Sequence, residues 1–151
     1  MIRVTLFLCL LGISSSLLAQ DMDNKKLQKI LKKVSSNNME GQPGQWRLEI
    51  GGLPFICLTD ETHNRMRIIS PVAEVANVSN EQIMACMEAN FHTALDVKYA
   101  ISEGYLWSVF IHPLKELSEE QVIDAVSQVY SATTTFGTTY SSGSLAFPGG
   151  R

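Results

Sequence analysis

The sequence lacks most of the motifs that reveal a protein's chemistry. It has no G-x-S-x-G nucleophile turn, no H-E-x-x-H zinc helix and no lysine-bearing phosphate loop. It also lacks excess positive charge, because the formal net charge is −3. Nucleic-acid binding usually needs a strongly basic face. We therefore expect no cofactor, no metal centre of a known pattern and no nucleic-acid partner.

Long apolar runs are scarce, and the longest predominantly apolar stretch lies at the N-terminus over Val4–Ile13. Arg3 precedes it, and small residues lead to Ala19, which is the pattern of a secretory signal peptide. The stretch is shorter than the roughly 20 residues that span a bilayer. We predict that residues 1–19 are a signal peptide, that the chain is exported to the periplasm or beyond, and that it has no stable membrane insertion after cleavage.

Cysteine is rare, with three in 151 residues, and Cys9 lies in the predicted signal peptide. Cys57 and Cys86 remain, and an even number in an oxidising compartment allows a disulfide. The alternative is two buried free thiols, because Cys57 lies in an apolar strand pattern and Cys86 in a helical one. Spacing alone does not decide between them.

Periodicity predicts three helices and five strands. The first helix has an apolar stripe at Leu27, Ile30, Leu31 and Val34, and a polar linker over 35–44 follows it. Ser79 with Gln82 and Ser118 with Gln121 form capping boxes that open the other two helices. The elements expected are helices over 21–34, 79–95 and 118–133, and strands over 46–50, 53–59, 65–72, 97–102 and 105–111.

Two features of the later elements bear on packing. Ile83, Met87, Phe91 and Leu95 recur along one side of the second helix, which predicts that this side packs on the sheet. The last strand is apolar on both faces, a pattern typical of a central strand or of one covered by a partner.

The fold class that this order predicts is α+β, helix–three strands–helix–two strands–helix, with an antiparallel five-stranded sheet covered by helices. It forms one domain over residues 21–136. A flexible tail rich in Ser, Thr and Gly is expected over 137–151.

Three short segments carry a family resemblance. They are Glu88-Ala89-Asn90-Phe91, the strand Arg65–Val72, and Tyr105–Val109 followed by His112-Pro113-Leu114. In this order and spacing they resemble the type III secretion chaperone-like fold and its YbjN-like branch, over about 46–137. The resemblance implies a scaffold without chemistry of its own, which forms a homodimer and binds partner proteins non-covalently. Secretion chaperones work in the cytoplasm, whereas this chain carries an export signal.

Candidate partner-contacting residues are Trp46, Arg65, Arg67 and Trp107. Aromatic side chains on strand faces form peptide grooves or dimer seams. The alternative for both tryptophans is an ordinary place in the core.

The sequence offers two candidate sites for metal binding or catalysis. Glu88 and His92 stand four apart on a helix and could hold zinc if a further ligand converged, but a surface ion pair is the favoured interpretation. His112 could act as a general base, but no nucleophile has a recognisable setting. We predict an exported, non-enzymatic protein-binding module. The alternatives are a small-molecule or envelope-stress sensor and, ranked last, a metal-assisted hydrolase using Glu88 and His92.

Overall fold

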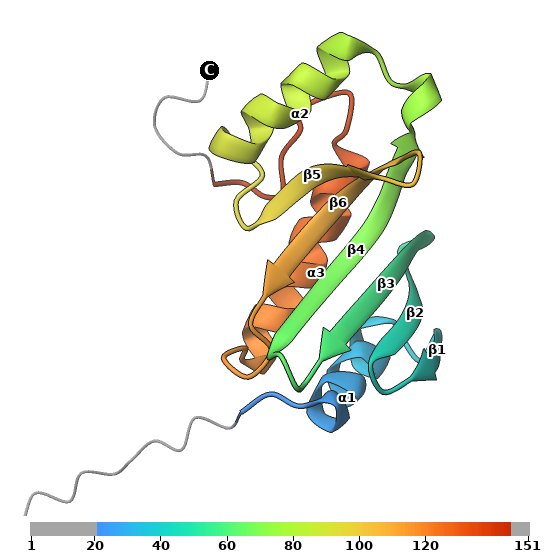
Figure 1. Cartoon of the computed structure of the whole chain (residues 1–151), viewed down its shortest axis with the longest axis vertical. Helices are drawn as coiled ribbons and strands as arrows, with labels where there is room; N and C mark the ends of the chain where they lie inside the picture. The colour runs from blue at the N-terminus through green and yellow to red at the C-terminus, as the bar shows by residue number, and fades with distance from the viewer. Residues whose placement is uncertain (1–20, 146–151) are drawn as a thin grey trace, which may run out of the picture.

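The computed structural model describes residues 21–145 as an α+β fold (Figure 1). Three α-helices, one short 3₁₀ helix and six strands make up this part of the chain. The elements are α1 (Asn24–Val34), β1 (Met39–Gln42), β2 (Gln45–Ile50), β3 (Leu53–Asp60), β4 (Arg65–Glu74), η1 (Val75–Asn77), α2 (Asn80–His92), β5 (Val97–Ser102), β6 (Tyr105–His112) and α3 (Glu119–Thr134).

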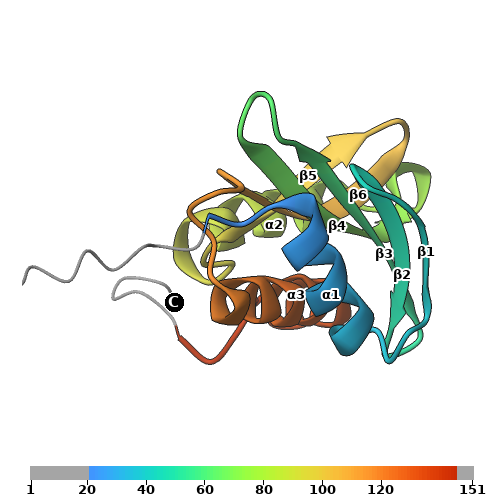
Figure 2. The ribbon, with the colours of Figure 1, turned by 90° about the horizontal axis from the view of Figure 1, so that it is seen from below.

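The strands form one antiparallel sheet in the order β1-β2-β3-β4-β6-β5. Helices α1 and α3 lie side by side against one face of this sheet (Figure 2). The view in Figure 1 is onto the opposite face, which no helix of residues 21–145 covers. Helix α2 lies at one end of the molecule and packs on β5.

Strand β1 corrects the predicted sheet, which has six strands within the described residues and not five. It lies inside the expected linker and pairs with β2 across the two-residue turn Pro43-Gly44. Only Met39 of its four residues is partly buried, because an edge strand at a solvated sheet margin makes little apolar contact. Backbone hydrogen bonds to β2 hold this strand in place, and such bonds produce no hydrophobic pattern in the sequence.

The core lies between the sheet and the pair α1 and α3. Helix α1 buries Leu27, Ile30 and Leu31, as its apolar stripe predicts. Helix α3 buries Val122, Val126 and Val129 in the same way. The sheet contributes its inward side chains, which are Trp46, Leu48, Phe55, Cys57, Met66, Ile68, Val97, Tyr99, Leu106 and Phe110.

Both predicted capping boxes are present. The Ser79 and Ser118 hydroxyls each accept from the backbone N–H of the glutamine three residues on, and each glutamine side chain accepts from the cap residue's own N–H. The first helix begins at Asn24, later than expected, because the Asp23 carboxylate caps it by accepting from the backbone N–H of Lys26 at 2.7 Å.

The predicted packing side of α2 is wrong. Met87 and Phe91 are 45% and 81% exposed, and the buried residues of this helix are Cys86 and Ala89. The prediction followed the larger apolar side chains. The helix instead turns its small residues toward β5, which allows a close approach, and leaves the larger side chains exposed to solvent.

Part of the expected flexible tail is packed. Within 137–145, Ser142 is buried, and the Tyr140 carbonyl accepts from the Thr93 hydroxyl at 2.7 Å. The Tyr140 ring lies 6.2 Å from that of Tyr99. These contacts tie the segment to the end of α2, and a Ser- and Gly-rich composition does not reveal them. Residues 146–151 and the predicted signal peptide lie outside the described residues.

Candidate protein-binding surfaces

The uncovered face of the sheet is rich in apolar side chains. We call it the open face. It consists of Ile56, Leu58, Arg67, Ile69, Trp107, Val109 and Ile111, on strands β3, β4 and β6. Ile111 is 56% exposed, and the other apolar members are partly buried by one another.

The antiparallel register arranges these residues in rows across the strands. One row runs Ile56, Ile69, Val109, with Arg47 before it on β2 and Lys98 after it on β5. Directly opposed residues of an antiparallel sheet share one face. The row is therefore a continuous apolar line between Arg47 and Lys98, and Glu40 of β1 lies directly opposite Arg47 on the same face.

The next row places Arg67 between Leu58 and Ile111. Its neighbours two residues away on β4 are Arg65 and Ile69. The nearest carboxylate on this face is that of Asp60, which lies diagonally across on β3, opposite Arg65, and pairs with His63 at 2.7 Å. Arg67 is exposed and forms no ion pair with any residue of 21–145. Arg65 is also exposed and donates to the Asn64 carbonyl at 3.0 Å.

The two tryptophans have different places. Trp46 is fully buried in the core on the helical side of β2, so it offers no surface to a partner in this structure. Trp107 lies on the open face, partly buried, and its indole N–H donates to the Ser102 carbonyl at 3.1 Å. Of the four candidate residues, the structure brings Arg65, Arg67 and Trp107 to one face and separates Trp46 from them.

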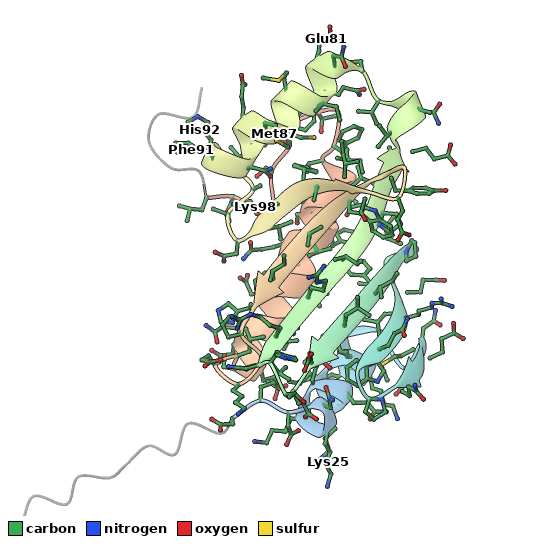
Figure 3. The ribbon with its side chains drawn as sticks, viewed as in Figure 1. Lys25, Glu81, Met87, Phe91, His92 and Lys98 are labelled. Carbon is green, nitrogen blue, oxygen red and sulfur yellow. The ribbon has the colours of Figure 1, made fainter. Side chains whose placement is uncertain are left out.

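A second exposed apolar surface lies on α2. We call it the α2 stripe. It consists of Met84, Met87 and Phe91, at i, i+3 and i+7, and its members are 60%, 45% and 81% exposed. Figure 3 labels Met87 and Phe91 along this helix, at the opposite end of the molecule from Lys25 on α1. Apolar residues this exposed and this regular are typical of an interaction surface.

Asn90 has a role that the sequence patterns did not identify. Its side-chain amide donates to the Tyr99 carbonyl at 3.1 Å, and its oxygen accepts from the Tyr99 N–H at 2.7 Å. The amide thus makes the two hydrogen bonds that a neighbouring strand would make with β5. Next to it, the Val97 N–H donates to the Ala94 carbonyl. Asn90 lies in one of the resemblance segments, which was the only sequence signal for it.

The disulfide alternative is not present, since Cys57 and Cys86 are both free and buried. Cys57 is on β3, and Cys86 is on α2, which packs on β5 three strands away. Burial raises the pKa of the Cys57 thiol to about 12 and that of Cys86 to about 11.

The candidate catalytic groups do not converge. Glu88 is exposed and forms no hydrogen bond or ion pair with His92 within the described chain. His92 instead places its ring edge-to-face on Phe91, with centroids 4.8 Å apart. No three His, Cys, Asp or Glu side chains of residues 21–145 are grouped as metal ligands.

His112 lines a surface cavity of about 440 Å³ with mixed polar and apolar walls, between the start of β5, the end of β6 and the start of α3. Its Nδ1 is 2.8 Å from the Pro113 carbonyl, and its ring stacks on Phe110. Asp96 and Asp124 also line this cavity, and both accept from the buried Gln128 amide. The cavity lacks the deep apolar lining that a sensor of apolar small molecules would need.

None of the helices within residues 21–145 has the length and apolar content required to cross a bilayer.

Comparison with known proteins finds no relative by sequence, but it finds solved structures with a similar fold. The chain matches no known protein-family model, and no curated protein matches it significantly. A chain in the ExsC–ExsE complex is similar with a TM-score of 0.56 and 14% identity, over 74% of this chain and 92% of that one.

Two further solved structures are similar to the same extent. A chain in the HopA1–SchA chaperone–effector complex has a TM-score of 0.54 at 13% identity, over 72% of this chain and 91% of that one. The Yersinia pestis type III secretion chaperone SycH, solved with a fragment of YscM2, gives 0.55 at 9% identity, over 74% and 99%.

The chain has a type III secretion chaperone-like fold. This confirms the fold that the resemblance implies. Assignment to the YbjN-like branch is tested by none of these structures and stays a prediction.

Proposed function

We propose that this protein is an exported, non-catalytic module that binds other proteins in the manner of a chaperone. The observation that carries the proposal is the open face, an apolar surface left uncovered on a fold shared with chains of chaperone–effector complexes. Large exposed apolar patches mark interaction sites on proteins that otherwise bury such surface. The client is another protein, and the domain holds it without making or breaking covalent bonds.

Capture in living cells tests this proposal. A photo-crosslinking amino acid replaces Ile111 on the open face, Met87 on the α2 stripe or, as the control, the exposed Lys29 on α1. We expect a client adduct from Ile111, an adduct with a second copy of this chain from Met87, and none from Lys29. Adducts absent from both apolar surfaces, or equal at all three positions, would contradict the proposal.

Export is part of the proposal and is supported by the N-terminal sequence. The full chain fused to alkaline phosphatase, which folds only outside the reducing cytoplasm, should give an active reporter in a bacterial host. Mass spectrometry of the exported chain should find a new N-terminus at Gln20. An inactive fusion that retains Met1 would show that residues 1–19 do not direct export.

Self-association into a homodimer is the second part, and the α2 stripe supports it. A two-fold axis pairs the same patch on both subunits, and Met84, Met87 and Phe91 form such a patch along one helix. We expect light scattering of the chain from residue 21 to give a dimer at micromolar concentration. Phe91→Ser should shift it to monomer, whereas Ile123→Ser, at an exposed apolar position on α3, should leave it dimeric. A monomeric wild type would refute this part.

A further inference from the structure

We propose that the open face binds an acidic amphipathic helix of a partner protein. This inference rests on the proposed function, because it specifies the chemistry of the client segment. It commits to the occupant of the surface, which the fold alone leaves undetermined.

The dimensions of the open face favour a helix. Ile56, Ile69 and Val109 lie on three adjacent strands, so their row spans about 10 Å. An α-helix with its side chains is about 10–12 Å across. One helix lying over β4 would therefore cover the row and contact Leu58 and Ile111 beside it.

The sheet edges disfavour an extended client. A strand-like segment binds by adding backbone hydrogen bonds at an edge. At the β5 edge, Asn90 already occupies both hydrogen-bonding groups of Tyr99, and Ala94 accepts from the N–H of Val97. The β1 edge has four residues. The larger unpartnered surface is the face of the sheet, and a helix is the element that covers a face.

The charges of the open face favour an acidic helix. Arg67 lies in the middle of the face between Leu58 and Ile111 and forms no ion pair within residues 21–145, and the Asp60 carboxylate diagonal to it pairs with His63. Arg47 and Lys98 lie on either side of the apolar residues of the central row, and of the two Lys98 has no carboxylate directly opposite, whereas Arg47 faces Glu40. A helix with carboxylates flanking its apolar stripe would pair with these cations, and burial under it would strengthen the Arg67–carboxylate contact.

The chain's own helices fit this face less well. Helix α1 carries five lysines over Asn24–Val34 and no acidic residue, so it would repel Arg67. The α2 stripe is flanked by Glu81 and Glu88 and is the competing occupant. In the proposed dimer, however, the α2 stripe packs on its symmetry mate and is not available to the open face. A second copy on the open face is therefore an outcome that the test must distinguish.

The test uses two labelled peptides of about 18 residues, long enough to form a helix. They share a leucine stripe at i, i+3, i+4 and i+7, and they differ only in having Glu or Lys beside it. Fluorescence anisotropy with the chain from residue 21 should show the Glu peptide binding roughly tenfold more tightly at low salt. Arg67→Glu should reverse the preference, whereas Lys29→Glu, the same charge change on α1, should leave it within about twofold.

Three results would overturn the inference. They are equal binding of the two peptides, an unchanged preference in Arg67→Glu, and loss of the dimer in Arg67→Glu, which would place a second copy on this face. Each can occur while crosslinking at Ile111 still captures a client, so this inference can fail and the proposed function stand. If crosslinking fails but the peptide preference reverses as expected, the face has the proposed chemistry and the cellular role is wrong.

Discussion

Asn90 completes the sheet at its β5 edge by standing in for a strand. Its amide both donates to and accepts from the backbone of Tyr99. An edge strand with free backbone groups is a template for unwanted pairing, and proteins close such edges in various ways. A single side chain on α2 therefore fixes the position of that helix and limits aggregation through β5.

Asn90→Ala tests this role. The substitution leaves the backbone N–H and carbonyl of Tyr99 without the hydrogen bonds that Asn90 makes to them. We therefore expect the free energy of unfolding to fall by about 2 kcal/mol. Urea denaturation followed by circular dichroism measures the change. Asn80→Ala, at the exposed first residue of the same helix, is the control and should cost less than about 0.5 kcal/mol. Equal effects would show that the amide contributes nothing beyond helix propensity.

Gly41 is the residue on which strand β1 depends. Its φ of +117° is unfavourable for other residues, and a Cβ there would overlap the Gln45 carbonyl oxygen. The hairpin turn brings the two strands together at this point. No side chain can be accommodated without separating β1 from β2.

Gly41→Ala is expected to destabilise the fold by about 2 kcal/mol or more, since it adds a clash to backbone strain. Gly44→Ala is the matched control in the same hairpin, because its φ is +99° but its Cβ would meet nothing closer than 3.8 Å. It should cost about 1 kcal/mol. The difference between their urea midpoints isolates the clash, and similar midpoints would contradict this explanation.

At the scale of elements, strong local signals were reliable and weak ones were not. The α1 stripe and both capping boxes could be predicted from the sequence, because each depends on residues close together in the chain. Strand β1 and the inward face of α2 could not. Pairing energy holds β1, and the close approach of Cys86 and Ala89 to the sheet orients α2.

The α3 cap gives an element-scale prediction. Ser118→Ala removes the acceptor for the Gln121 N–H, and we expect the free energy of unfolding to fall by about 1 kcal/mol. Ser131→Ala, inside the same helix, should be neutral or slightly stabilising, because alanine has the higher helix propensity. Thermal melts of the two variants measure the contrast. A loss in Ser131→Ala as large as in Ser118→Ala would contradict the assignment of the cap.

At the scale of the whole molecule, burial links stability to alkaline pH. Burial raises the pKa of Cys57 from 9.0 to about 12 and of Cys86 to about 11, and it raises the pKa of Tyr99 as well. Between pH 9 and these folded-state values the unfolded chain releases protons that the folded chain keeps. Stability is therefore full below pH 9 and falls as the pH rises above it.

Urea unfolding at pH 8, 9 and 10 under reducing conditions should show this decline. A group within its window contributes a slope of about 1.4 kcal/mol per pH unit. Cys57→Ala removes one such group. The free energy of unfolding of this variant should therefore fall less steeply with pH than that of the wild type, whatever its value at pH 8. Parallel slopes would show that Cys57 does not contribute.

The sequence by itself determined the three helices and five of the six strands of residues 21–145, and it contains no recognisable catalytic motif. It also predicts an export signal over residues 1–19. These depend on composition and on periodicity over neighbouring residues. Only the tertiary structure decided that Trp107 and Arg67 share an uncovered face while Trp46 is buried, that Cys57 and Cys86 are both buried as free thiols, and that α2 turns Met84, Met87 and Phe91 outward. Such features depend on which strands are adjacent and on which face the helices cover, and residues distant in the chain set both.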